Sequence, residues 1–241
     1  MDVTGDQIET TAWRLREGPT MKVMLTRLIA GVAYAGIAAG SALVPTANAA
    51  IVTNGDFATG DFTGWTLFTT PNGSLGPSGS GLPAVTSFNV TGSGAQNAAT
   101  FNVGEVVSNA TQQGGGLTQT VTLPGGPISF SANIAVTAPL SFNFEGGVFN
   151  VLLDGITEDT VDIGPIGLGA VIRDTLSFTT TESTGAHALE ILVTRPFIND
   201  SITPDQFITN IDIAAVVPEP ASLALLAAGL LSFAAVRRWP S

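Results

Sequence analysis

Short runs in which apolar and polar residues alternate fill the middle of the chain. In Leu117–Leu123 the apolar positions alternate with three threonines, and in Ile128–Val136 they alternate with two serines and an asparagine. A period of two places every second side chain on one face, as in a half-buried β-strand. The segment Pro124–Pro127 (PGGP) between the runs predicts a turn, so the two runs are expected to form a hairpin.

Similar runs recur between residues 50 and 216, separated by segments rich in glycine, serine and asparagine, and no long helical period interrupts them. This pattern predicts an all-β fold, one antiparallel β-sandwich with its own core. Further strands are expected near Trp65–Thr70, Ala84–Val90, Ala98–Val103, Ser141–Phe144, Phe149–Leu153, Ile172–Thr179, Ala188–Thr194 and Phe207–Val216.

The last apolar run differs from the strands. Ala221–Val236 carries no charge and is rich in Ala and Leu, and Arg237 and Arg238 follow it directly. Pro218 and Pro220 prevent a helix from extending upstream. A helix of this length spans about 24 Å, and a thinned bilayer or snorkelling arginines would make up the difference from a core of roughly 30 Å. The run predicts a single hydrophobic membrane helix, and a buried core helix of a soluble domain is the alternative.

Another apolar run, Leu28–Val44, lies near the other end, behind a basic segment that starts at Met21. Ala47-Asn48-Ala49 then fits the small-x-small rule, which predicts a signal peptide from Met21 to Ala49 and cleavage before Ala50. Residues 1–20 are polar and lack an apolar period. We expect them to be either an over-extended gene prediction ahead of the true start or a long signal n-region.

Composition excludes several classes of function. The chain has no cysteine, and therefore no disulfide, thiol nucleophile or thiolate metal site. Between residues 50 and 217, fourteen acidic residues face two arginines and no lysine, a formal charge of −12. Such a surface repels phosphate backbones, which argues against binding of nucleic acid. It favours solubility and can attract divalent cations.

Candidates for catalysis are few. His187 is the only histidine, and no serine or acid stands at a spacing that indicates a triad with it. A structural or exposed histidine is expected. Asp154, Glu158, Asp159 and Asp162 do not follow the spacing of an EF-hand, and they predict a solvated acidic loop. The sequence therefore predicts a protein without enzymatic activity.

The number of exposed aromatic side chains indicates whether a protein can bind sugars, because sugar rings stack on flat aromatic rings with a solvent-exposed edge. Trp65 is the only tryptophan between residues 50 and 217, where twelve phenylalanines and no tyrosine occur. Trp65 is expected to pack in the core. The domain therefore has few aromatic rings on which a glycan could stack, although its Asp and Asn side chains could form hydrogen bonds with sugar hydroxyl groups.

The tail Val217–Arg238 combines Pro218-Glu219-Pro220, the apolar helix and Arg237-Arg238, in that order. It resembles the PEP-CTERM sorting signal of exopolysaccharide-producing Gram-negative bacteria. The resemblance implies export through the inner membrane as a membrane-anchored precursor. It implies processing near the motif by an exosortase, a transpeptidase-like membrane enzyme, and a final place at the cell surface or outside the cell. Signal peptidase, exosortase and exopolysaccharide are the partners it suggests.

The middle of the chain also resembles a known family. Asn54–Trp65 (NGDFATGDFTGW) is similar to the opening of galactose-binding-like jelly rolls, which include many carbohydrate-binding modules. Phe149–Gly155 resembles their strand with an Asp-Gly turn, and Ile211–Ile213 resembles their closing strand. The resemblance implies a jelly-roll sandwich over residues 50–216, flanked by the signal helix and by the sorting segment 217–238.

This second resemblance implies a calcium ion between the first and last strands. Its candidate ligands are Asp56, Asp212 and the carbonyl of Asn54, since Ca²⁺ takes six to eight oxygens. Ala58 and Ile211 stand where the family has acidic residues. Calcium and plain turn capping by the aspartates both stay open, and no other cofactor is expected.

Three functions follow from these observations. The leading one is an exported, exosortase-sorted protein of the surface or extracellular matrix, associated with exopolysaccharide or biofilm and without catalytic activity. The alternative is a carbohydrate-binding module, which an exposed aromatic strip would favour. A secreted hydrolase is the third, and converging carboxylates or a serine beside His187 would favour it.

Overall fold

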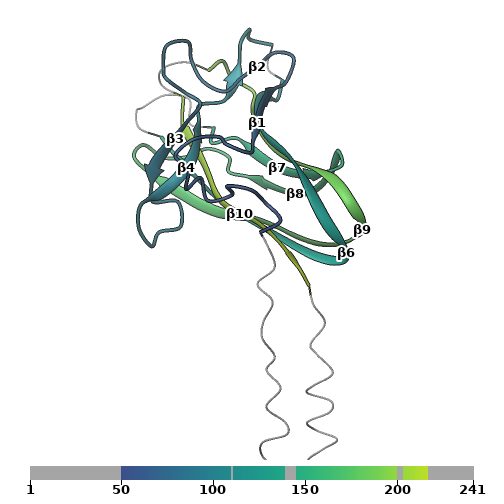
Figure 1. Ribbon diagram of the computed structural model, residues 1–241. Coiled ribbons are helices and arrows are strands. Elements are labelled where there is room, and N and C mark those ends of the chain that lie inside the picture. The colour runs from purple at the N-terminus through teal and green to yellow at the C-terminus, as the bar shows by residue number, and fades with distance from the viewer. Residues whose placement is uncertain (1–49, 110, 139–144, 200–202, 217–241) are drawn as a thin grey trace, which may run out of the picture. The chain divides into compact units, whose positions relative to one another are not determined.

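The computed structural model describes residues 50–109, 111–138, 145–199 and 203–216, which form a β-sheet domain (Figure 1). The two terminal helices and the strand that the sequence predicts near Ser141–Phe144 lie outside these residues. No helix in the described part is long and apolar enough to cross a membrane. The strands are β1 (Thr66–Thr69), β2 (Gly73–Ser74), β3 (Ala84–Phe88), β4 (Gln96–Phe101), β5 (Gly104–Glu105), β6 (Gln113–Thr137), β7 (Val148–Leu153), β8 (Ile156–Asp162), β9 (Val171–Arg195) and β10 (Asp205–Ala215).

Two long strands, β6 and β9, run through the whole domain. They pair antiparallel in one register, from Gln113 opposite Arg195 to Thr137 opposite Val171. The other strands attach to this ribbon in the order β3-β4-β10-β6-β9-β7-β8, and β1 also pairs with β6. The short strands β2 and β5 form a separate pair. The prediction of an all-β antiparallel sandwich is confirmed.

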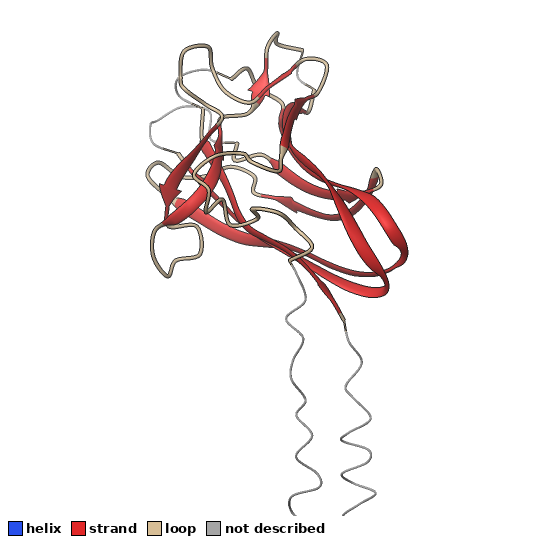
Figure 2. Ribbon diagram, in the orientation of Figure 1, coloured by secondary structure: helices blue, strands red, loops and turns tan. Residues whose placement is uncertain are grey.

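A corner in the middle of the ribbon converts one sheet into two layers. Before it, odd-numbered side chains of β6 such as Leu123 are buried, and after it even-numbered ones such as Ile128 are buried. Both sets belong to one hydrophobic cluster. Gly125 and Gly126 lie between them with φ of 83° and 87°, which residues with a Cβ rarely adopt. The two halves of the ribbon thus enclose a common core (Figure 2).

The predicted hairpin between Leu117–Leu123 and Ile128–Val136 is wrong. The two runs are successive parts of β6, and β9 pairs with both of them. The runs near Ile172–Thr179 and Ala188–Thr194 are likewise joined in β9. Glycines with positive φ serve a hairpin turn and a corner equally well. Only the partner strand, distant in sequence, distinguishes the two.

The acidic stretch after Asp154 is a strand, β8, rather than the predicted solvated loop. Asp154 and Gly155 have φ of 53° and 79°, as a two-residue turn between β7 and β8 requires. Asp159 Oδ2 accepts a hydrogen bond of 2.8 Å from the N–H of Ser177 on β9. This bond satisfies a backbone donor on β9, so the side chain of Asp159 joins β8 to β9.

Gln119, on the first half of β6, fastens the start of the domain to the ribbon. Its Oε1 accepts from Thr53 N–H at 2.7 Å, while its Nε2 donates to the carbonyls of Thr53 and Gly64 at 3.0 and 2.9 Å. The side chain is 8% exposed, so these bonds replace water that it has lost.

We predict that Gln119→Leu lowers the free energy of unfolding by about 2 kcal/mol, because it leaves three backbone groups without a partner. The melting temperature should fall by roughly 4–8 °C. Thr122→Val, on the same strand but with an exposed side chain, is the matched control and should change it little. Equal melting temperatures for the two variants would show that Gln119 does not hold the segment.

Candidate functional site

The opening segment Asn54–Trp65 is a loop held by its own side chains. Asn54 Nδ2 donates to the carbonyls of Asp61 and Thr63, both at 3.0 Å. Asp61 Oδ1 accepts from the Thr59 hydroxyl at 2.7 Å and from Thr63 N–H at 2.9 Å. These hydrogen bonds, that of Thr59 foremost, lower the pKa of Asp61 below its ordinary value. Asp61 therefore caps a turn.

Trp65 closes this loop from the core side. Its side chain is 8% exposed and stacks on Phe57 with ring centroids 6.2 Å apart. Its Nε1 donates to the carbonyl of Asn54 at 3.1 Å. The prediction that Trp65 lies in the core is confirmed, and its ring is not available as a platform for a sugar.

Asp56 and Asp212, two of the predicted calcium ligands, line one shallow pocket of about 360 Å³ together with Asn54. The backbone explains why they meet. The carbonyl of Gly55 accepts a hydrogen bond of 2.9 Å from the N–H of Ile211, which fastens the opening segment to β10. The structure thus brings together the three residues that the sequence analysis selected for this site.

The oxygen atoms at this pocket fit calcium poorly. Within the described residues, no group of three acidic, histidine or cysteine side chains could hold a metal ion. The carbonyl of Asn54 already accepts from Phe57 N–H at 3.2 Å and from Trp65 Nε1, which occupies both lone pairs. Asp56 Oδ1 accepts from Ala58 N–H at 3.1 Å and so caps a turn. Calcium binding stays a prediction without a complete ligand set.

His187 is paired with Asp154, the turn residue between β7 and β8. Its Nδ1 lies 2.7 Å from Asp154 Oδ2, and its Nε2 lies 3.0 Å from the carbonyl oxygen of Ser183. Both partners are acceptors, so the ring donates from both nitrogens and is protonated in this geometry. The hydrogen bond that His187 donates to Asp154 is the main cause that raises the pKa of His187. The pKa of Asp154 is lowered, first by the N–H of Ala188 and then by His187.

A buried polar cluster at the loop end of the domain was not foreseen from the sequence. Asn102 Nδ2 donates to Asp205 Oδ1 at 2.6 Å, and Gln206 Oε1 accepts from Val103 N–H at 3.0 Å. Arg195 Nη1 donates to the carbonyl of Val103 at 3.0 Å. Burial raises the pKa of Asp205, and the bond from Asn102 opposes this. The members come from β9, β10 and the two residues after β4, so no local motif could have indicated them.

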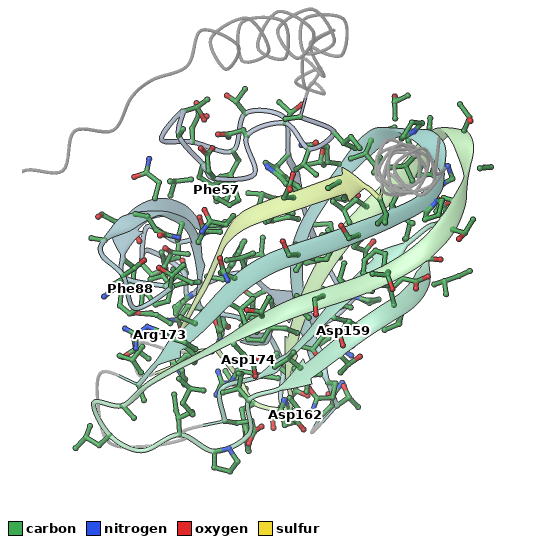
Figure 3. The ribbon with its side chains drawn as sticks, turned by 90° about the horizontal axis from the view of Figure 1, so that it is seen from below. Phe57, Phe88, Asp159, Asp162, Arg173 and Asp174 are labelled. Carbon is green, nitrogen blue, oxygen red and sulfur yellow. The ribbon has the colours of Figure 1, made fainter. Side chains whose placement is uncertain are left out.

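The outer face of β10, β6 and the first half of β9 carries small polar side chains. Asp212, Ser131 and Ser177 form one row across the three strands, since they are cross-strand partners. All three are exposed. Figure 3 looks onto this face and shows Phe88 and Arg173 at one end of it. Further members of the face are Ser129, Asn133, Thr175 and Thr179.

The sorting motif follows the last strand without a linker. β10 ends at Ala215, and the N–H of Val216 donates to the carbonyl of Pro127 at the corner, at 2.9 Å. The motif residues Pro218-Glu219-Pro220 and Arg237-Arg238 lie outside the described part of the chain. The folded domain therefore extends to the point where the motif begins.

An all-β sandwich that runs directly into such a tail defines a class, the exported β-sandwich proteins with a C-terminal sorting signal. Residues 216–238 match the PEP-CTERM protein-sorting motif, which confirms the predicted signal. The motif marks an exported protein that an exosortase processes. No curated protein sequence matches the chain.

Solved structures of carbohydrate-binding modules are similar to the sandwich. TmCBM61 in complex with beta-1,4-galactotriose is 16% identical, with 69% of this chain and 98% of that chain covered and a TM-score of 0.38. The CBM22-1 xylan-binding domain of Paenibacillus barcinonensis Xyn10C is 11% identical, with 66% and 90% covered and a TM-score of 0.35. A family 35 module from Clostridium thermocellum is 11% identical, with 65% and 95% covered and a TM-score of 0.34. At these values no ligand is transferred to this chain.

The His187–Asp154 pair predicts a pH dependence of stability. Because the pKa of His187 is raised in the folded state, its contribution is complete below pH 6.5 and is lost as the pH rises through the raised pKa. The contribution of Asp154, whose pKa is lowered, is lost only in acid. The advantage of the wild type over His187→Asn in urea unfolding should therefore shrink between pH 6 and pH 9.

Ser183→Ala is the control for this series, because Ser183 contacts the ring only through its backbone carbonyl. It should keep the wild-type pH dependence. If the difference in unfolding free energy between the wild type and His187→Asn were the same at pH 6 and pH 9, His187 would not be charged in the folded protein.

Proposed function

We propose that this protein is a non-catalytic β-sandwich that exosortase processing leaves at the cell surface or in the extracellular matrix, associated with exopolysaccharide. The observation that carries this proposal is the PEP-CTERM motif that begins at residue 216, directly after β10. In this proposal the route starts with signal peptidase, which cuts between Ala49 and Ala50. Exosortase then removes the hydrophobic tail.

The absence of catalysis is supported by the way the ionisable groups are used. A general base needs a nitrogen or a carboxylate oxygen that is free to accept a proton and lies within reach of the proton to be removed from the substrate. Both ring nitrogens of His187 donate to acceptors, and the neighbouring Ser183 offers its carbonyl rather than its hydroxyl. The carboxylate of Asp154 accepts from both Ala188 N–H and His187. These groups hold strands together and leave no nucleophile–base pair among them.

Sorting is tested by replacing Pro218-Glu219-Pro220 with alanines in a host that has the exosortase. The variant should remain in the membrane fraction with an intact tail, because the enzyme no longer recognises it, while the wild type is released from that fraction. Replacing Pro124 and Pro127 with alanines is a control that changes prolines at the corner of the sandwich. Release of the triple-alanine variant at the wild-type rate would count against exosortase processing.

Carbohydrate binding is the second candidate, and the outer face of β10, β6 and β9 favours it. The exposed row of Asp212, Ser131 and Ser177 offers donors and acceptors of the kind that sugar hydroxyls need. Hydrogen bonds of this kind orient a ligand but contribute modestly to affinity in water. A weak ligand of many repeats, such as the polysaccharide of the host, fits this face better than a single tightly held sugar.

The exported protein should therefore be mixed with purified exopolysaccharide and assayed for binding and for turnover. Our leading proposal expects no turnover of the polysaccharide or of p-nitrophenyl esters and glycosides. If the second candidate is also right, Ser131→Ala/Ser177→Ala should weaken binding about tenfold, as loss of roughly 1.4 kcal/mol predicts. Thr120→Ala/Thr122→Ala, on the first half of β6 before the corner, is the control and should bind normally. Turnover that His187→Ala abolishes would overturn the non-catalytic proposal.

A further inference from the structure

The pocket at the start of the domain holds two carboxylates without a cation. Asp56 and Asp212 both line it and are exposed, and neither has a basic partner within the described residues. The third feature of the pocket is Ala50, the first residue of the described domain. Two like charges in one pocket repel each other, so a positive group between them would be favoured.

The residues that follow Ala50 are anchored to the sandwich. Val52 is buried at 4% exposure, and both backbone groups of Thr53 are bonded to Gln119. The Gly55 backbone contacts that of Ile211 so closely that a Cβ on Gly55 would lie 2.0 Å from the Ile211 oxygen. These anchors hold the segment from Val52 onward against β10, and Ala50, two residues ahead of Val52, lines the pocket.

Cleavage by signal peptidase changes the charge at this point. Hydrolysis of the Ala49–Ala50 bond consumes one water and leaves a carboxylate on Ala49 and an ammonium group on Ala50. An α-amino group has a pKa of about 7.7–8.0 and is therefore charged at neutral pH. In the precursor the same nitrogen is an uncharged amide.

We propose that this pocket is the binding site of the mature N-terminus, where the α-ammonium group of Ala50 pairs with Asp56 and Asp212. The inference rests on the proposed cleavage between Ala49 and Ala50. Maturation then strengthens the contact between the first segment and β10, because it supplies a cation to a pocket that has only anions. Residues 50–217 otherwise contain only two arginines and one histidine as basic side chains. One added positive charge is therefore a larger share of the basic groups than in a domain with equal numbers of acidic and basic residues.

The sequence permits a selective test. Lys22, the only lysine of the chain, precedes the cleavage site, so amine reagents modify the exported protein at Ala50 alone. Acetylation removes the charge of the amino group, whereas reductive dimethylation keeps it. At pH 6, low salt and with EDTA to exclude metal ions, acetylation should lower the melting temperature by roughly 1–3 °C. Dimethylation should leave it unchanged.

The difference between the two modified forms should vanish above pH 10, where the amine is neutral, and in Asp56→Asn/Asp212→Asn. Asn keeps the turn-capping oxygen of Asp56, so this variant is expected to fold. Asp174→Asn, exposed on β9, is the matched control and should keep the difference.

Equal melting temperatures for the acetylated and dimethylated protein would overturn the inference, as would a difference that survives in the double variant. N-terminal sequencing separates this failure from a failure of the proposed export route. A first residue other than Ala50 refutes the cleavage and the pairing together. A first residue of Ala50 with equal melting temperatures refutes the pairing alone.

Discussion

The antiparallel ladder between β6 and β9 is the constraint on which the other parts of this domain depend. Since one register holds from Gln113–Arg195 to Thr137–Val171, the two layers are continuous and cannot shift past one another. Gln119, in the first half of β6, fixes the start of the domain, and β10 pairs with the second half. The corner at Gly125 and Gly126 therefore brings the first and last segments of the sandwich to one pocket.

Because the domain has few basic residues, most of its carboxylates need other partners than Lys or Arg. Coulombic pairs with Lys or Arg are few by composition, so carboxylates are satisfied by backbone N–H groups. Asp61 caps a turn, Asp159 accepts from the N–H of Ser177 on β9, and Glu105 accepts from two N–H groups of its own loop. Such bonds are local or cross-strand, and each is a charge-assisted hydrogen bond that stabilises the ionised carboxylate. The exposed acids that remain give the domain an acidic surface, which favours solubility.

The sequence correctly predicted the features that depend on residues close together in the chain. Strand positions, the core role of Trp65 and the sorting motif all follow from period, composition or a short pattern. It did not predict which strands and side chains, distant in the sequence, pair with one another. The corner was read as a hairpin turn because PGGP suits both, and β8 was read as a loop because its acids hide the strand period. The buried cluster of Asn102, Arg195 and Gln206 joins residues about a hundred positions apart, which only the tertiary fold brings together.

The sorting motif marks an exported protein that an exosortase processes, and we propose that signal peptidase also cleaves the chain before Ala50. The mass of the intact protein recovered from outside the inner membrane tests this most directly. The account predicts one species that starts at Ala50 and ends upstream of the apolar segment Ala221–Val236. A species that still carries residues 21–49 or Arg237-Arg238 would contradict it.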